Sequence, residues 1–232
     1  MVAVLTTLDG SLTLANARYG ETYRSRQGAL TEARHVFLGS SGVAALLRER
    51  GRAAVLEVGF GTGLNLLVTA CAAAAAGARL DYVGIERDPV PASQLAELRY
   101  DRLLAPCDLP LALLGWLASL GERPAPGRHR FTAGGVSLEL VVGEARDAAA
   151  GLPEGAFDAV YLDPFSPRAN PDAWEEDLLA LLLRALRPGG RLVSYSVSGE
   201  VRRRLAGAGA RVSKAPGPPG GKRESLVAER PG

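Results

Sequence analysis

A glycine-rich turn between an apolar run and a helical pattern constrains this chain more than any other stretch. The segment 53–67, AAVLEVGFGTGLNLL, has an apolar run that ends in Glu57, then glycines at 59, 61 and 63, then the start of an apolar helix. In an open α/β sheet this order makes a ligand site at the carboxyl end of the first strand. Glycine is favoured because the turn needs positive φ and because a ligand can then approach the backbone closely.

The spacing of these glycines limits which ligand the turn can bind. A dinucleotide fingerprint would have its third glycine at position 64, which is Leu64 here. The spacing found resembles motif I of class I methyltransferases, which bind S-adenosylmethionine. A tight strand-to-helix connection without a ligand is the alternative, and the downstream motifs favour the ligand. The residues expected to bind the cofactor in this stretch are Glu57, Gly59, Gly61, Gly63 and Asn65.

Length and composition bound the architecture. With 232 residues, of which 47% are apolar, the chain can build one substantial core. We expect one domain over 1–232, with an extension and helix over 1–50 and a Rossmann-like core over 51–232. The net charge of +2 creates no overall field that requires nucleic acid.

Two sequence features suggest a location for the protein. Cys71 and Cys107 lie far apart in apolar segments, so we expect buried reduced thiols, as in cytosolic proteins. The amino-terminal stretch MVAVLTTLDG has no basic leader before an apolar run, and the apolar stretch 70–76 is too short to span a bilayer. We therefore expect a soluble cytoplasmic protein.

Strand and helix patterns alternate along the chain. Near-continuous apolar strands between helices predict a parallel sheet covered on both faces. The fold class is therefore α/β, a class I (Rossmann-like) fold with a mostly parallel seven-stranded sheet. After the first strand and the glycine turn, further strands are expected over 80–86, 131–133, 136–142, 158–163, 191–197, 210–214 and 224–229, and helices over 28–50, 64–76, 93–120, 173–186 and 200–205.

Acidic residues follow the second strand and the strand over 136–142. Glu86 ends the second strand, where an acid accepts hydrogen bonds from the two ribose hydroxyls of a bound nucleoside. Glu144 follows Val142 and can accept from the exocyclic amine of adenine, while backbone at Ala145 contacts the ring. A solvated strand end is the alternative for both acids.

A third acid begins the run DPFSPRANPDAW. Asp163 ends a strand and is followed by Pro164 and Phe165, which resembles the Asp-Pro-Pro-Tyr motif of methyltransferases that act on amino nitrogens. Methyl transfer needs a neutral amine, whereas an alkyl amine is protonated below a pKa of about 10. Asp163 can accept hydrogen bonds from the amine, orient it and take its proton. A proline-rich turn would fit this run equally well if the glycine motif did not precede it.

Four stretches together resemble one family, the methyltransferase domain of the bacterial tRNA 5-methylaminomethyl-2-thiouridine biosynthesis enzyme. They are ETYRSRQGALTEARHVFLG, EVGFGTGLNLL, LDPFSPRANPDAW and GKRESLV, and the resemblance covers residues 19–229. It implies methyl transfer from S-adenosylmethionine to the amine of 5-aminomethyluridine at the tRNA wobble position. It also implies that Asp163 is the catalytic residue.

The resemblance also sets the expected partners. The substrate is tRNA, without a membrane, an obligate protein partner or a metal. The stretches resemble stand-alone members without a flavin oxidase domain, so no flavin is expected. Pro164 and Glu144 differ from the glycine and aspartate usual in the bifunctional forms. Residues expected to bind substrate are Tyr23, Pro164, Phe165, Arg202, Lys222 and Arg223, the last three through tRNA phosphates.

Other readings of the same residues remain open. An aminopropyltransferase uses a decarboxylated form of the same cofactor, although its glycine turn normally carries a further acid that is missing between Gly59 and Gly63. A module that binds tRNA or cofactor without catalysis is the second alternative. His35 is expected to be structural, and the charged stretch 123–130 is expected to be a solvated loop.

Overall fold

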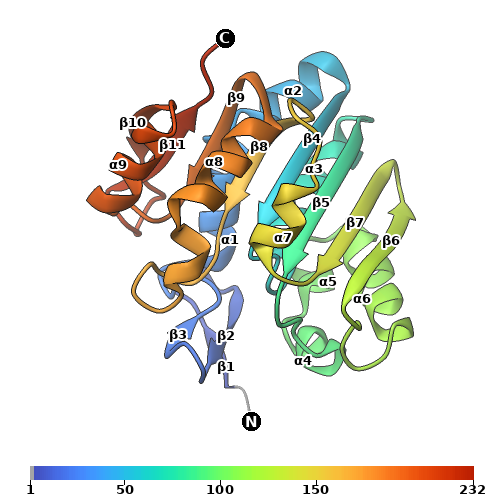
Figure 1. Cartoon of the computed structure of the whole chain (residues 1–232). Coiled ribbons are helices and arrows are strands. Elements are labelled where there is room, and N and C mark those ends of the chain that lie inside the picture. Colours follow the sequence, from blue (N-terminus) through green and yellow to red (C-terminus); the bar gives the residue numbers. More distant parts are fainter. Residues whose placement is uncertain (1–2) are drawn as a thin grey trace.

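A large sheet runs through the middle of the computed structural model, which describes residues 3–232 (Figure 1). The first two residues of the amino-terminal stretch MVAVLTTLDG lie outside the described residues. The α/β class predicted from the sequence is confirmed. The eight strands of the sheet are, in spatial order, β10 (Arg211–Pro216), β11 (Glu224–Glu229), β9 (Leu186–Ser194), β8 (Phe157–Leu162), β4 (Arg52–Val58), β5 (Arg79–Glu86), β7 (Val136–Val142) and β6 (Gly127–Ala133).

Strand β4 lies where the chain changes direction across the sheet. It pairs in parallel with β5 on one side and with β8 on the other, and the pairs β5–β7 and β8–β9 are parallel too. From β4 the chain builds outward through β5 and β7, and it then returns to β8 beside β4. A crevice therefore opens beyond the carboxyl ends of β4 and β8, which is where ligands bind in open α/β sheets.

The sheet has eight strands, whereas seven are expected for the fold class. At its edge, β6 pairs with β7 through a hairpin at Gly134–Gly135, in agreement with the strands predicted over 131–133 and 136–142. The sequence also predicts a loop over 123–130, but the strand already begins at Gly127. No residue of this edge strand is fully buried, so no apolar alternation marks its start. Arg128 and Arg130 both pair with Glu139 of β7, so this carboxylate offsets part of their charge within the sheet.

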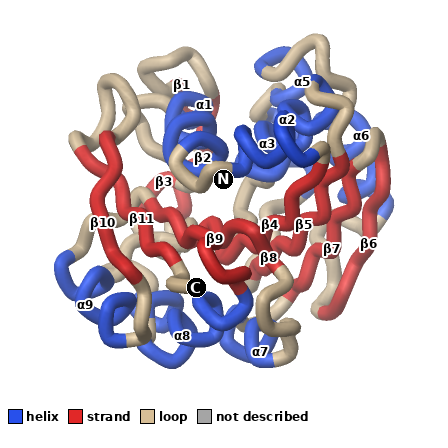
Figure 2. The backbone as a smooth tube through the Cα atoms, turned by 90° about the horizontal axis from the view of Figure 1, so that it is seen from above, coloured by secondary structure: helices blue, strands red, loops and turns tan. Residues whose placement is uncertain are grey.

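Helices cover both faces of the sheet. Figure 2 shows α1, α2, α3, α5 and α6 on one face and α7, α8 and α9 on the other. The two long helices predicted over 28–50 and 93–120 are interrupted near the expected glycines and prolines. Among the described residues, no helix is long and apolar enough to cross a bilayer. The helix bounds are α1 (Ala29–Glu32), the π-helix η1 (Ala33–Gly39), α2 (Val43–Arg50), α3 (Leu64–Ala75), α4 (Ala92–Glu97), α5 (Tyr100–Leu103), α6 (Leu109–Ser119), α7 (Ala145–Ala150), the 3-10 helix η2 (Pro171–Trp174), α8 (Glu176–Ala185) and α9 (Gly199–Gly207).

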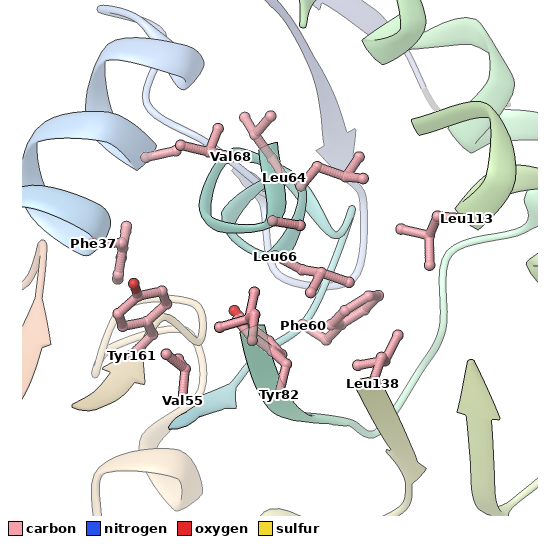
Figure 3. Packing of buried hydrophobic residues seen from close by; sticks show 14 of the residues in the cluster. Phe37, Val55, Phe60, Leu64, Leu66, Val68, Tyr82, Leu113, Leu138 and Tyr161 are labelled. Atoms are coloured by element: carbon pink, nitrogen blue, oxygen red, sulfur yellow. The ribbon is translucent and has the colours of Figure 1, made fainter. Parts of the chain in front are cut away.

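Each face of the sheet has its own hydrophobic core. Val55 of β4 belongs to the core under α3, whereas its neighbour Leu56 belongs to the core under α8, as the alternation of side chains along a strand requires. Figure 3 shows the first core, in which Phe60 of the glycine turn lies among strand and helix side chains. The glycine turn is therefore anchored from below by a buried aromatic ring.

A second, three-stranded sheet comes from the amino-terminal segment, for which the sequence predicts only an absence of helix. Its antiparallel strands are β1 (Val4–Thr6), β2 (Leu12–Asn16) and β3 (Glu21–Thr22). It lies beside the carboxyl ends of the central strands of the large sheet (Figure 1). The small sheet thus forms one wall of the crevice.

The prediction of two separate reduced thiols is wrong. Cys71 of α3 and Cys107 form a disulfide, with their Cα atoms 5.9 Å apart. The two residues are 36 positions apart, and they meet because the turn before α6 packs against α3. Sequence spacing alone gave no sign of this contact.

The ring of Phe60 packs so closely on Gly84 of β5 that a side chain at this position should destabilise the fold. A Cβ atom at Gly84 would lie 2.5 Å from Cδ2 of Phe60. We expect Gly84→Ala to lower the free energy of unfolding by about 1–3 kcal/mol, as overpacking does, when measured by urea unfolding. The control is Gly115→Ala in α6, where a Cβ meets nothing within 4 Å and where alanine favours the helix. Equal stability of the Gly84→Ala variant and the wild type would contradict this packing.

Candidate functional site

A cleft of about 1130 Å³ lies between the small amino-terminal sheet and the carboxyl ends of the large sheet. Its walls come from the ends of β4, β5, β7, β8 and β9 and from residues of β1–β3. The cleft therefore lies at the point where the strand order reverses. The predicted site residues that line it are Tyr23, Gly59, Gly61, Glu86, Glu144, Ala145, Asp163, Pro164, Phe165 and Lys222.

The glycine turn forms the centre of the cleft. Gly59 and Gly61 have φ values of 85° and 54°, as the sequence predicts for this turn. A Cβ atom at Gly59 would lie 2.6 Å from the backbone oxygen of Asp163, and one at Gly61 would lie 3.1 Å from the ring of Tyr23. The space that a Cβ atom would need at either glycine is thus already occupied by a neighbouring residue. The backbone of both glycines borders the cleft. Gly63 lies deeper, against Phe60, and does not line the cleft.

The carboxylate of Glu86 is fixed against the glycine turn. Its Oε2 accepts a hydrogen bond of 2.8 Å from the backbone N–H of Gly61, and its Oε1 accepts one of 2.9 Å from Asp88. Burial raises the pKa of Glu86, and the backbone N–H donors oppose this rise. The carboxylate is therefore oriented before any ligand arrives, with acceptor capacity left toward the cleft.

Glu144 and Ala145 lie across the cleft, after β7. The side chain of Glu144 is 56% exposed, and its Oε2 lies 3.5 Å from Nη1 of Arg87. Arg87 also donates a hydrogen bond to the hydroxyl of Tyr19 and approaches Asp172 at 4.0 Å. Arg87 therefore connects the wall after β7 to the small sheet, a role that the sequence did not indicate.

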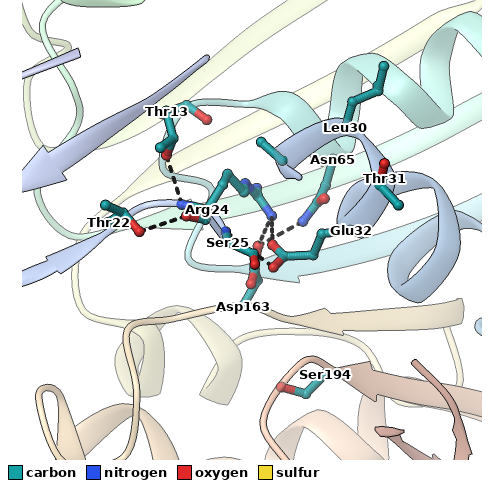
Figure 4. A network of polar contacts seen from close by, with 12 residues as sticks. Thr13, Thr22, Arg24, Ser25, Leu30, Thr31, Glu32, Asn65, Asp163 and Ser194 are labelled. Atoms are coloured by element: carbon teal, nitrogen blue, oxygen red, sulfur yellow. Dashed lines mark hydrogen bonds and ion pairs between the residues drawn. The ribbon is translucent and has the colours of Figure 1, made fainter. Parts of the chain in front are cut away.

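Asp163 lies at the floor of the same cleft, directly after β8. Its backbone N–H donates to the carbonyl of Val58, which fixes the residue beside the glycine turn. Its side chain is 12% exposed, and its Oδ2 accepts hydrogen bonds from Asn65, at 2.9 Å, and from Arg24 (Figure 4). The carboxylate is thus held from behind through one oxygen while it borders the cleft.

Arg24 is the main residue that the sequence analysis missed. Its side chain is 2% exposed and pairs with Asp163, and it lies 3.7 Å from Glu32 and 3.9 Å from Glu57. The guanidinium also lies over the ring of Phe37. Arg24 reaches this position from the loop after β3, 139 residues away from Asp163 in sequence, so no local pattern could have indicated the pair.

One guanidinium faces three buried carboxyl groups in this cluster. Burial raises the pKa of Glu32 and of Glu57 to about 8, and it raises the pKa of Asp163 to about 6. Arg24 opposes each of these rises. The physical cause is simple: one positive charge cannot balance three negative charges away from water, so protons are retained on the carboxyl groups. Near neutral pH, Arg24 and Asp163 are therefore the charged members of the cluster, while Glu32 and Glu57 are largely protonated.

Glu57 and Asn65 lie one layer below the cleft, whereas the sequence predicts direct contact with the cofactor. Glu57 is fully buried and accepts hydrogen bonds of 2.8 Å from Asn65 and from the hydroxyl of Tyr82. Asn65 bridges Glu57 to Asp163, and its own Oδ1 is buried without a partner. Both residues support the floor of the cleft because the end of β4 and the start of α3 are covered by the glycine turn.

Aromatic rings fill the other side of the cleft. Phe165 stacks on Tyr19 with ring centroids 4.3 Å apart and meets Tyr23 edge-on at 5.1 Å. The following residue, Ser166, donates its backbone N–H to Glu21 of β3 at 3.0 Å. The loop after Asp163 is therefore clasped by the small amino-terminal sheet.

The three basic residues predicted to bind phosphates are not together. Lys222 lines the cleft, where its Nζ lies 4.3 Å from the ring centre of Tyr195. Arg223 is exposed and does not line it. Arg202 lines a separate pocket of about 460 Å³ with Arg203 and Lys214, because α9 lies beyond the end of β9. His35 contacts the carbonyl of Pro216, in agreement with a structural role.

Comparisons with known proteins show which family this chain resembles. A family described as "S-adenosyl-L-methionine-dependent methyltransferase" matches residues 118–231. The "tRNA 5-methylaminomethyl-2-thiouridine biosynthesis bifunctional protein MnmC" of Ralstonia nicotianae is 40% identical over 230 residues, 93% of this chain and 33% of that protein. The protein of the same name from Aromatoleum aromaticum is 42% identical over 88% of this chain and 32% of its own length. The chain therefore spans about a third of the length of these relatives.

Solved structures show the same similarity. The crystal structure of MnmC2 from Aquifex aeolicus matches with a TM-score of 0.78 and 28% identity, and the match covers 99% of this chain and 70% of that one. Spermidine synthase from Thermotoga maritima shares the fold, with a TM-score of 0.57 and 13% identity over 99% of this chain and 69% of that one. The resemblance identified from the four sequence stretches is confirmed, and so is the class I methyltransferase fold.

Glu32 allows a test of the buried charge cluster. Because burial raises its pKa above that of the unfolded chain, Glu32 stabilises the fold below about pH 4.5, and this contribution is lost as the pH rises to about 8. We expect Glu32→Gln, which has no proton to lose, to reduce the fall in unfolding free energy between about pH 5 and 9. The reduction should be on the order of 2 kcal/mol.

Urea unfolding at each pH measures this change. The control is Glu49→Gln on the exposed end of α2, which should follow the wild type at every pH. A Glu32→Gln variant whose stability falls as steeply as that of the wild type would show that Glu32 is already ionised at about pH 5.

Proposed function

From the fold and family match of a class I S-adenosylmethionine-dependent methyltransferase, we infer that this chain methylates the amine of 5-aminomethyl(-2-thio)uridine at the tRNA wobble position. It is thus proposed to be a tRNA (5-aminomethyl-2-thiouridylate) methyltransferase. The observation that carries the proposal is the position of Asp163, which borders the same cleft as Gly59 and Gly61. The similarity to proteins named for tRNA 5-methylaminomethyl-2-thiouridine biosynthesis supports this substrate.

The cleft fits S-adenosylmethionine, the cofactor of the matched family. Gly59 and Gly61 line the cleft with backbone alone, and the carboxylate of Glu86 is pre-oriented beside them. In our proposal Glu86 accepts the ribose hydroxyls, while Glu144 and the backbone at Ala145 hold the adenine. When bound, the cofactor supplies a methyl group on a positively charged sulfur, which an amine lone pair can displace.

Asp163 is proposed to act on the amine. Its carboxylate accepts a hydrogen bond from the amine and directs the nitrogen lone pair toward the methyl group. The nitrogen–carbon bond would form as the carbon–sulfur bond of the methyl donor breaks, and the proton left in excess on the product nitrogen would be taken up by Asp163 and passed to water. Pro164 restrains the loop behind the amine. A module that only binds would not need a carboxylate at this position.

The aromatic wall and the basic residues are proposed to hold the RNA. Tyr23 and Phe165 offer ring faces on which a planar base can stack. Lys222 at the cleft, with Arg223 and Arg202 farther along the surface, would pair with phosphates. No obligate protein partner enters this scheme, and a tRNA substrate suits a cytoplasmic location. Among the described residues, no group of His, Cys, Asp and Glu side chains could hold a metal ion, and the scheme uses neither metal nor flavin.

An aminopropyltransferase is not favoured. The spermidine synthase structures share the fold at 13–14% identity, which shows the fold alone. The relatives that share about 40% identity with this chain are named for tRNA 5-methylaminomethyl-2-thiouridine biosynthesis instead.

Mass spectrometry of nucleosides tests the proposed function. Purified protein, S-adenosylmethionine and tRNA that carries 5-aminomethyluridine should yield 5-methylaminomethyluridine. Asp163→Asn should lower the rate by at least about 100-fold, since a neutral amide cannot take the proton. The control is Asp101→Asn in α5, which lies outside the cleft and should keep the wild-type rate. Absence of product from the wild-type protein would overturn the proposal.

Salt-dependent binding tests the role of Lys222. Lys222→Gln should weaken tRNA binding about threefold to tenfold at low salt and reduce the slope of log affinity against log salt by about one. The matched control is Arg50→Gln at the end of α2, whose charge lies outside the cleft and which should bind tRNA as the wild type does. An unchanged slope for Lys222→Gln would remove this residue from the RNA interface.

A further inference from the structure

Arg24 is a buried cation next to the reacting position that the proposed chemistry does not use. Its side chain is 2% exposed, and its guanidinium pairs with Oδ2 of Asp163, the carboxylate oxygen that also accepts from Asn65 (Figure 4). Arg24 is held in place by its own backbone: its N–H donates to Thr13 at 3.0 Å, and its carbonyl accepts from Thr22 at 2.7 Å. The buried cation is therefore fixed beside Asp163 at the edge of the cleft, which Arg24 also lines.

We propose that Arg24 is a positioning residue whose buried charge offsets that of Asp163, so that the amine to be methylated binds in its neutral, nucleophilic form. This inference rests on the proposed function. It goes beyond it by assigning the protonation state of the bound amine to a residue of the small amino-terminal sheet region.

Without Arg24, Asp163 would be an unpaired carboxylate at the cleft. A carboxylate out of water attracts a cation strongly, so an isolated Asp163 would hold the substrate as an ammonium ion. An ammonium has no lone pair and cannot attack the methyl group. With Arg24 paired to the same carboxylate, the pair has no net charge, so an ammonium gains little from binding beside it. A neutral amine can still donate a hydrogen bond to Asp163.

The other groups around the pair do not alter this balance near neutral pH. Burial raises the pKa of Glu32 and Glu57 to about 8, so both remain largely protonated there. Burial also raises the pKa of the nearby phenols, which stay neutral. Lys222 at the cleft adds a positive charge, which further disfavours an ammonium. The titratable groups around the pair are Glu32 from α1, Glu57 from β4, Tyr82 from β5, Tyr100 from α5, Tyr161 from β8 and Lys222 from the loop before β11.

Single-turnover rates across pH test this inference, because they report ionisations in the complex of enzyme and substrate. Rates are measured between about pH 6 and 10 for the wild type, Arg24→Gln and Arg24→Lys. We expect the acid limb of the Arg24→Gln profile to move up by about one pH unit or more. Near pH 7 the single-turnover rate of this variant should be about tenfold or more below that of the wild type. At the alkaline end of the range its rate should recover to within about threefold of the wild-type rate. Arg24→Lys keeps the charge and should keep the wild-type acid limb.

Three controls separate the possible failures. Calorimetry with S-adenosylmethionine shows whether each variant retains the cofactor site, and Arg34→Gln on the exposed side of η1 should match the wild type throughout. Wild-type protein that makes no product would sink the proposed function itself. If the wild type forms product but the rate of Arg24→Gln is reduced by the same factor at every pH, the proposed role of Arg24 is wrong. The proposed function would not be affected by that result.

A second measurement needs no variant and therefore does not depend on whether Arg24→Gln folds. The acid limb of the wild-type profile is compared with the pKa of the aminomethyl group in the same tRNA free in solution, measured by NMR titration. The inference expects the wild-type limb to lie below the pKa of the free amine. A wild-type limb above that value would mean that the site favours the ammonium, and the inference would be wrong.

Discussion

The close approach of two backbones, at Gly59 and at Asp163, positions everything else in the cleft. Parallel pairing of β4 with β8 brings the ends of the two strands side by side, and the N–H of Asp163 donates to the carbonyl of Val58. The chain then turns at Gly59 so tightly that a Cβ atom there would lie 2.6 Å from the backbone oxygen of Asp163. The glycine turn and the backbone of Asp163 can be this close only because residue 59 has no side chain.

The loop after β8 is also held from the opposite side, by the amino-terminal segment. Arg24 pairs with Asp163, Glu21 accepts from Ser166, and Tyr19 stacks on Phe165. These contacts use a cation, an anion and a ring on three nearly consecutive positions of the loop. The large sheet therefore carries the glycine turn on one side of the cleft, while the small sheet holds the loop after Asp163 on the other. The geometry of the cleft depends on the packing of both.

Sequence patterns predicted the parts of the site that are built locally. The glycine turn and the acids at the ends of β5 and β8 are each encoded by a local pattern of about ten residues, and so is each strand or helix of the alternating series. Arg24 could not be found in this way, because its partner is 139 residues away and nothing in ETYRSRQG distinguishes it from an exposed arginine. The disulfide of Cys71 with Cys107 and the first half of the exposed strand β6 were not predicted for related reasons: each depends on a tertiary neighbour and not on a periodic pattern.

The buried charge cluster costs stability, and its protonation state shows how the site tolerates it. Three carboxyl groups around one guanidinium are unfavourable away from water, and an apolar cluster of the same volume would stabilise the fold better. Near neutral pH the cluster resolves into two protonated acids, Glu32 and Glu57, and one ion pair, Arg24 with Asp163. The acids then serve as neutral walls that keep the guanidinium directed at Asp163. A methyl donor that is itself positively charged reacts best with a neutral amine, and a floor with no net charge is the surface on which a neutral amine competes successfully with its ammonium form.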